Sequence, residues 1–193
     1  LPENTPRFRS QLQELKQLVM RHLGDYVYAV GDTSLEEHIV SMFESQGQTL
    51  AIAEAGTGGL VTAGLSEVDQ ARKVLSGTFV APSVGKLRRM LRISEEAWKA
   101  CTSRSQELEL LATAAVGTNG SQCVLVVGEA RQDVSGIQYL EMATKLPRAR
   151  VVVQRVHLGG SGSFDRDRLV TRILAGLWRH WREISPEEKG EAK

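Results

Sequence analysis

Residues 49–68 read TLAIAEAGTGGLVTAGLSEV. The first six of them, residues 49–54, are short and almost wholly apolar, which predicts a strand that is buried on both faces. Residues 55–59 are rich in glycine and predict a tight turn, and residues 60–68 predict a helix. A buried strand, a glycine-rich turn and a helix in this order are typical of an α/β unit.

The remaining hydrophobic patterns add to this unit on both sides. Helices are predicted at residues 7–23, 35–46, 84–91 and 104–117, after residue 94, and at residues 165–182; strands are predicted at residues 76–81, 123–127, 134–142 and 150–157. This order predicts a three-layer α/β/α sandwich on a mixed sheet of about five strands, with an N-terminal helical lead-in. We expect residues 1–32 to form that lead-in and linker, residues 33–184 the domain, and residues 185–193 a disordered tail.

Composition excludes several classes of protein. The chain has 193 residues, with 24 Lys and Arg against 23 Asp and Glu, so its net charge is +1. Such a balance lacks the long-range field of a general nucleic-acid binder. No run approaches the roughly 20 apolar residues that a membrane span needs. Two cysteines, Cys101 and Cys123, and four scattered histidines favour a cytoplasmic protein with ordinary thiols, no metal site and no cofactor.

The glycine-rich turn is the first candidate site. A turn that leads into a helix N-terminus exposes backbone N–H groups and the positive end of the helix dipole, which suits a phosphate group. Thr57, Gly58 and Gly59 are therefore candidate ligand-binding residues. The alternative is a tight turn that binds nothing. Glu54 has two interpretations as well, because it can hold the turn through hydrogen bonds or act as a base.

Residues 47–66 closely resemble the CinA C-terminal domain family, whose signature here is Glu-Ser-x-Thr-Gly-Gly. The fainter resemblance covers residues 24–182 and includes SQCVLVVG at residues 121–128 and Phe164-Asp165-Arg166-Asp167. This family comprises competence/damage-inducible proteins and nicotinamide-nucleotide amidases. The resemblance implies hydrolysis of the carboxamide of nicotinamide mononucleotide with release of ammonia. It also implies a serine nucleophile that a nearby lysine and tyrosine help to activate, and it makes Arg166 a candidate ligand-binding residue.

The departures from the family pattern fall on this chemistry. Ala55 stands at the position of the nucleophilic serine, and Ala81 stands at the position of the tyrosine in an ungapped alignment between Gly77 and Lys86. A shift by one residue puts Pro82 there instead, which restores no phenol. Residues 128–132, GEARQ, replace the family's Gly-Ile-Ala-Gly-Pro. Because alanine has no heteroatom, no acyl-enzyme can form at this position.

Lys86 also has two interpretations. It is either the remaining catalytic lysine or one charge on a solvated basic helix. The sequence therefore favours a divergent, catalytically inactive CinA-like domain that serves as a structural, oligomerisation or nucleotide-binding module, with a nucleotide or phosphate as ligand and a second copy as partner. The alternative is an active amidohydrolase that uses another nucleophile, such as Thr57 or Ser83. RNA binding is a third and weaker hypothesis, because no aromatic residues interleave with the basic helix.

Overall fold

A computed structural model describes residues 5–29, 31–158 and 164–184 of the chain, with only the backbone described at residues 25 and 164–167. Its central strand is β1 (Leu50–Ala55), which is buried along its whole length. β1 lies between β2 (Leu75–Ala81) and β3 (Cys123–Val127) and runs parallel to both. An almost continuous apolar strand with covered faces is what a parallel centre requires.

Three further strands complete the described sheet, and all of their pairings are antiparallel. β5 (Gln138–Lys145) pairs with β3, with the short β4 (Arg131–Gln132) and with β6 (Val152–His157). The order is β2-β1-β3-β5-β4, with β6 also on β5, so the described sheet has six strands. The prediction of a mixed sheet of about five strands is confirmed, and the additional strand is the two-residue β4.

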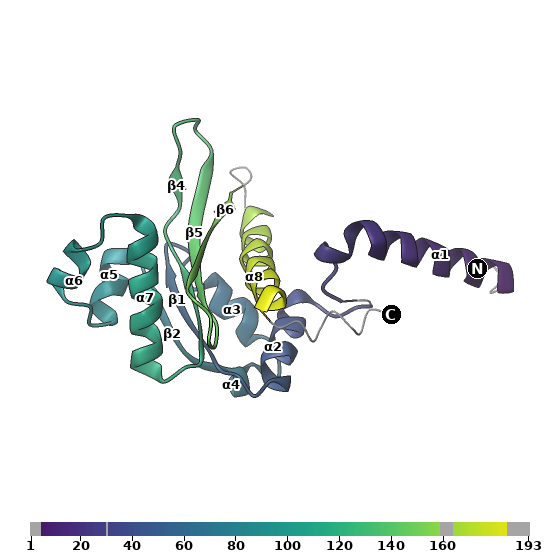
Figure 1. Cartoon of the computed structure of the whole chain (residues 1–193), viewed down its shortest axis with the longest axis horizontal. Helices are drawn as coiled ribbons and strands as arrows, with labels where there is room; N and C mark the ends of the chain where they lie inside the picture. The colour runs from purple at the N-terminus through teal and green to yellow at the C-terminus, as the bar shows by residue number, and fades with distance from the viewer. Residues whose placement is uncertain (1–4, 30, 159–163, 185–193) are drawn as a thin grey trace. The chain divides into compact units, whose positions relative to one another are not determined.

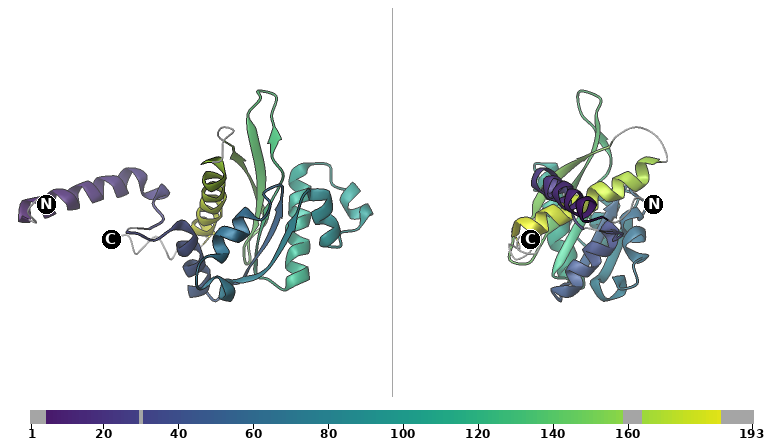
Figure 2. Two further views of the ribbon diagram at one scale, coloured as in Figure 1. Left: turned by 180° about the vertical axis from the view of Figure 1, so that it is seen from behind. Right: turned by 90° about the vertical axis from the view of Figure 1, so that its right-hand side faces the viewer.

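The prediction of one strand over residues 134–142 is wrong at its beginning. Asp133 Oδ1 accepts hydrogen bonds from the backbone N–H groups of Ser135, at 2.8 Å, and Ile137, at 3.0 Å. Gly136 has a φ of +81°. A side chain that satisfies its own following backbone in this way stabilises a turn in competition with a strand. The segment is therefore the tip of the β4–β5 hairpin, which extends beyond the other strands in Figures 1 and 2.

Helices cover both faces of this sheet, as Figures 1 and 2 show. One layer consists of α5 (Val84–Met90), α6 (Glu95–Lys99) and α7 (Arg104–Asn119); the other consists of α2 (Leu35–Ser45), α3 (Leu60–Ser66), α4 (Ala71–Val74) and α8 (Phe164–Ile184). The three-layer α/β/α sandwich is thus confirmed. Ala51, Ala53 and Ala55 of β1 belong to the apolar cluster that also contains Leu87 of α5 and Leu108 of α7.

The chain divides into two units, Leu1–Ser34 and Leu35–Lys193. The first contains α1 (Pro6–Leu23) and the short 3-10 helix η1 (Gly24–Tyr26), which confirms an N-terminal helix. The predicted domain limits at residues 32 and 184 stay predictions, and residues 185–193 lie outside the described residues. None of the helices in the described ranges is both long and apolar enough to cross a membrane.

The two cysteines are free thiols in different environments. Cys123 is buried in β3, and this burial raises its pKa to about 12. Cys101 is half-buried, and its pKa is also raised, first by burial and then by the charges of Glu107 and Glu109. Across the described ranges, no three His, Cys, Asp or Glu side chains gather as a metal site would require.

Candidate functional site

The positions that the resemblance assigns to the serine and the tyrosine lie side by side. Ala55 ends β1, Ala81 ends β2, and the two residues are partners in the parallel ladder. Neighbouring strands lie about 4.8 Å apart. Ala55 is 0% exposed and Ala81 is 3% exposed, and both belong to the apolar cluster with Val84. The two positions are thus neighbours at one edge of the sheet, but their methyl groups cannot attack a substrate or transfer a proton.

The glycine-rich turn follows Ala55 and has an unusual backbone. Gly56, Gly58 and Gly59 have φ values of +81°, +69° and +88°, in the left-handed region where a Cβ is strained. Thr57 between them is buried, whereas Gly58 is exposed. Within the part of the chain that the structure describes, the backbone N–H groups of Thr57, Gly58 and Gly59 donate no hydrogen bond. Anion binding by these groups stays a prediction.

Glu54 caps the helix that follows this turn. Its carboxylate is 0% exposed and accepts hydrogen bonds from Thr57 Oγ1 at 2.7 Å, from the N–H of Val61 at 3.1 Å and from the N–H of Thr62 at 2.8 Å. The hydroxyl of Thr62 donates a fourth bond. Gly59, the N-cap residue of α3, has no side chain for this purpose. The negative charge that the α3 N-terminus favours is therefore supplied by the chain itself, and these contacts are those of the turn-holding interpretation.

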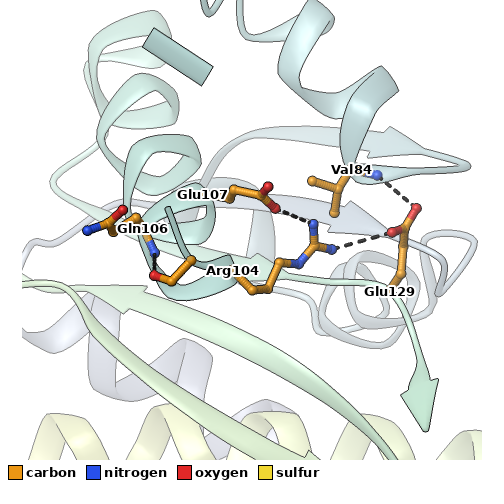
Figure 3. A network of polar contacts seen from close by, with 6 residues as sticks. Val84, Arg104, Gln106, Glu107 and Glu129 are labelled. Atoms are coloured by element: carbon orange, nitrogen blue, oxygen red, sulfur yellow. Dashed lines mark hydrogen bonds and ion pairs between the residues drawn. The ribbon is translucent and has the colours of Figure 1, made fainter. Parts of the chain in front are cut away.

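A second carboxylate, that of Glu129, lies beside the turn, and Figure 3 shows its polar contacts. Glu129 Oε1 accepts a hydrogen bond from the N–H of Val84, the first residue of α5, at 3.0 Å. Glu129 Oε2 lies 3.4 Å from Arg104 Nη2, and Arg104 Nη1 lies 2.7 Å from Glu107 Oε2. A Cβ at Gly56 would lie 3.3 Å from the Cα of Glu129. Glu129 therefore connects the end of β3 to the first residues of α5 and α7, at the sheet edge where β1 ends with Ala55 and β2 ends with Ala81.

The backbone before Glu129 requires a glycine. The N–H of Gly128 donates to the carbonyl of Glu141 at 2.8 Å, and a Cβ at Gly128 would lie only 2.9 Å from that carbonyl oxygen. This close approach leaves no room for a side chain at the position between β3 and Glu129. The sequence comparison identified Glu129 as a departure from the family pattern but missed this role. The available signal was an acidic residue two positions after a buried strand, at the same sheet edge as the glycine-rich turn.

Among the side chains that the structure describes, those of Lys86 and Ser83 make no hydrogen bond or ion pair at the alanine pair. Lys86 is exposed, and in the described part of the chain its side chain makes no ion pair or hydrogen bond. Its backbone N–H donates to Ser83 Oγ at 3.3 Å, so Ser83 serves as the N-cap of α5. Arg166 lies in the first turn of α8, and its side chain lies outside what the structure describes.

Replacing Glu129 by alanine is expected to lower the free energy of unfolding by about 0.5–2 kcal/mol, the range for loss of a helix cap. The loss is limited because Arg104 keeps Glu107 as a partner and because Glu129 is 36% exposed. Urea unfolding measures the change. Glu109→Ala is the matched control, since Glu109 is an exposed acid on α7 whose side chain caps no helix; equal losses for the two variants would contradict the assigned role.

The relatives of the chain fall in one family. The family model described as "CinA C-terminal domain" matches residues 32–130. A CinA-like protein of Dictyoglomus turgidum is 38% identical over 81 residues, which cover 42% of this chain and 20% of that protein. A CinA-like protein of Chlorobium luteolum is 27% identical over 172 residues, which cover 84% of this chain and 40% of that protein. The chain thus spans two fifths or less of the length of these two relatives.

Solved structures agree on the fold. The competence/damage inducible protein CihA from Agrobacterium tumefaciens has a TM-score of 0.59 and 21% identity, covering 79% of this chain and 99% of that one. The competence damage-inducible protein A from Klebsiella pneumoniae has a TM-score of 0.64 and 18% identity, covering 76% and 96%. Since the matched family model covers more than half of the 193 residues, this chain belongs to the CinA C-terminal domain family.

Proposed function

We propose that this domain is a non-catalytic member of the CinA family that acts as a structural module. The observation that carries the proposal is the buried pair of Ala55 and Ala81 at the ends of two neighbouring parallel strands. Hydrolysis of an amide through a serine nucleophile, as the resemblance implies for the family, needs that nucleophile and a group that takes its proton. Neither methyl group supplies either function, and both are buried in the apolar cluster.

The glycine-rich turn contains groups that favour nucleotide binding and groups that oppose it. The N–H groups of Thr57, Gly58 and Gly59, which donate to no described acceptor, support contact with a phosphate group. The carboxylates of Glu54 and Glu129 lie at the same turn and repel an anion. Because Glu54 already occupies the N-terminus of α3, we expect at most weak affinity for nicotinamide mononucleotide.

Two measurements on the unmodified protein test the proposal. We expect no release of ammonia from nicotinamide mononucleotide above the buffer rate, and no saturable heat when the nucleotide is titrated into the protein in a calorimeter. Glu129→Gln removes one charge from the turn and is expected to raise the affinity for inorganic phosphate, whereas Glu109→Gln is not. Saturable binding without turnover would replace the structural role by a nucleotide-binding one, and turnover would overturn the proposal.

The second candidate is an amidohydrolase that uses Thr57. It is favoured by the 2.7 Å hydrogen bond from Thr57 Oγ1 to Glu54, an arrangement of hydroxyl and carboxylate. Against it, Thr57 is only 9% exposed, and the same carboxylate also accepts three hydrogen bonds from Val61 and Thr62. Ammonia release that is lost in Thr57→Val and kept in Thr57→Ser would establish this candidate in place of the first.

A further inference from the structure

α1 carries a continuous apolar stripe that is open to solvent. α1 is an 18-residue helix with no buried residue. Six large apolar side chains on it are each 40–57% exposed: Phe8, Leu12, Leu15, Leu18, Val19 and Leu23. Apolar side chains that gather on one face of a helix are a common mark of an interaction surface, in contrast to apolar residues scattered singly.

The spacing of the stripe is that of a coiled-coil seam. Phe8, Leu12, Leu15 and Val19 follow each other at intervals of four, three and four residues. They therefore occupy the heptad positions d, a, d and a, with a β-branched residue at one a and leucine at one d, as two-stranded parallel coiled coils favour. At 100° per residue these four side chains fall within about 60° of the helix circumference. With Leu18 and Leu23 on its two flanks the apolar face widens to about 140°, so the heptad spacing of the four seam residues, rather than the width of the face, favours a second helix as the partner.

The residues that flank the seam distinguish the two orientations of a helix pair. Leu18 falls at position g and Leu23 at position e, five residues later. In a parallel pair, g of one helix lies against the following e of the other, so Leu18 meets Leu23 of the second copy. In an antiparallel pair, e lies against e, which would bring the positive charges of Arg9 and Lys16 together. Both the apolar and the charged flanking residues therefore favour the parallel arrangement.

We infer that α1 is a self-association surface, and that it pairs with α1 of a second copy of this chain in a parallel two-stranded coiled coil. The 18 residues amount to about two and a half heptads, so the association is concentration-dependent. The inference involves only the unit Leu1–Ser34 and does not depend on whether the other unit has enzymatic activity. It assigns this surface to the homo-oligomer that the sequence suggests.

Sedimentation equilibrium of the full chain over a wide range of concentration tests the surface. The unmodified protein is expected to shift from monomer to dimer as its concentration rises. Leu15→Asp places a charge in the seam and is expected to abolish dimerisation. Gln17→Asp makes the same charge change on the exposed opposite side of α1 and is expected to leave the dimer intact. A monomer at every concentration, or a dimer that Leu15→Asp leaves unchanged, would overturn the inference.

Two further variants test the orientation and keep the inference falsifiable if Leu15→Asp merely melts the helix. Leu12→Cys in a Cys101→Ser background is expected to form an intermolecular disulfide, because position a faces itself only in a parallel pair; Gln17→Cys is the control. Leu18→Glu alone is expected to weaken the dimer, and adding Leu23→Lys is expected to restore it. Binding of a monomer to anionic vesicles, lost in Leu15→Asp, would show that the stripe is a lipid face and would overturn the inference.

Discussion

Replacing Glu54 by alanine is expected to destabilise the domain by about 3 kcal/mol or more. The substitution leaves the N–H groups of Val61 and Thr62 and the hydroxyls of Thr57 and Thr62 without their acceptor. Val61 and Thr57 are buried and Thr62 is half-buried. Each unsatisfied buried donor costs about 1–3 kcal/mol, although the four costs do not add fully. In a protein of this length, 3 kcal/mol lowers the Tm by about 6–12 °C, which thermal unfolding followed by circular dichroism detects.

Glu54→Gln removes the charge of the Glu54 side chain and keeps its volume, so it separates the contributions of the two to stability. The amide keeps the packing, but its NH2 group must face donors of the turn or of α3, so we expect a loss of about 1–3 kcal/mol from the unmet donors. Glu44→Gln is the control, since Glu44 makes a half-exposed ion pair with Lys73 at 2.6 Å, and such pairs contribute about 0–1 kcal/mol. Equal losses for Glu54→Gln and Glu44→Gln would show that the buried carboxylate does not hold the turn.

The fold was predictable where one pattern persisted over a whole element. The apolar run before the glycines predicted β1, and the spacing of apolar residues predicted helices such as α7, which lies at Arg104–Asn119. The failures occurred where a few residues decide the structure. α4 has only four residues, too few to show a period. At residues 133–137 the hydrogen bonds of one side chain, Asp133, replaced the predicted strand by a turn.

The candidate site was predictable only in part, for a related reason. Ala55 and Ala81 were singled out by the resemblance to the family signature. They are the last residues of β1 and β2, and parallel strands bring their carboxyl ends to one edge of the sheet. The role of Glu129 was not accessible in this way. Its partners Arg104 and Val84 lie 25 and 45 residues away in the sequence. No local pattern connects residues so far apart, and only the assembled layers bring them together (Figure 3).

Restoring the family serine is expected to yield a folded protein that still releases no ammonia from nicotinamide mononucleotide. In Ala55→Ser the new hydroxyl enters a site that is 0% exposed and lies among apolar side chains. Without a partner there, it costs about 1–3 kcal/mol, so thermal unfolding should show a lower Tm. Ala63→Ser is the control, because Ala63 lies on the exposed side of α3 and its replacement costs only about 0.5 kcal/mol of helix propensity.

Adding the family tyrosine as Ala81→Tyr is expected to destabilise the protein further and not to produce activity. Ala81 is 3% exposed and its carbonyl accepts from the N–H of Gly56 at 3.4 Å, so a tyrosine side chain there overfills the core at a cost of about 1–3 kcal/mol or more. Glu129 would remain beside the turn in Ala55→Ser/Ala81→Tyr. Ammonia release by Ala55→Ser alone that is lost again in Ala55→Ser/Lys86→Ala would contradict this expectation. It would mean that the exposed Lys86 reaches the serine. The absence of the serine hydroxyl would then be the sole reason for the inactivity of the unmodified site.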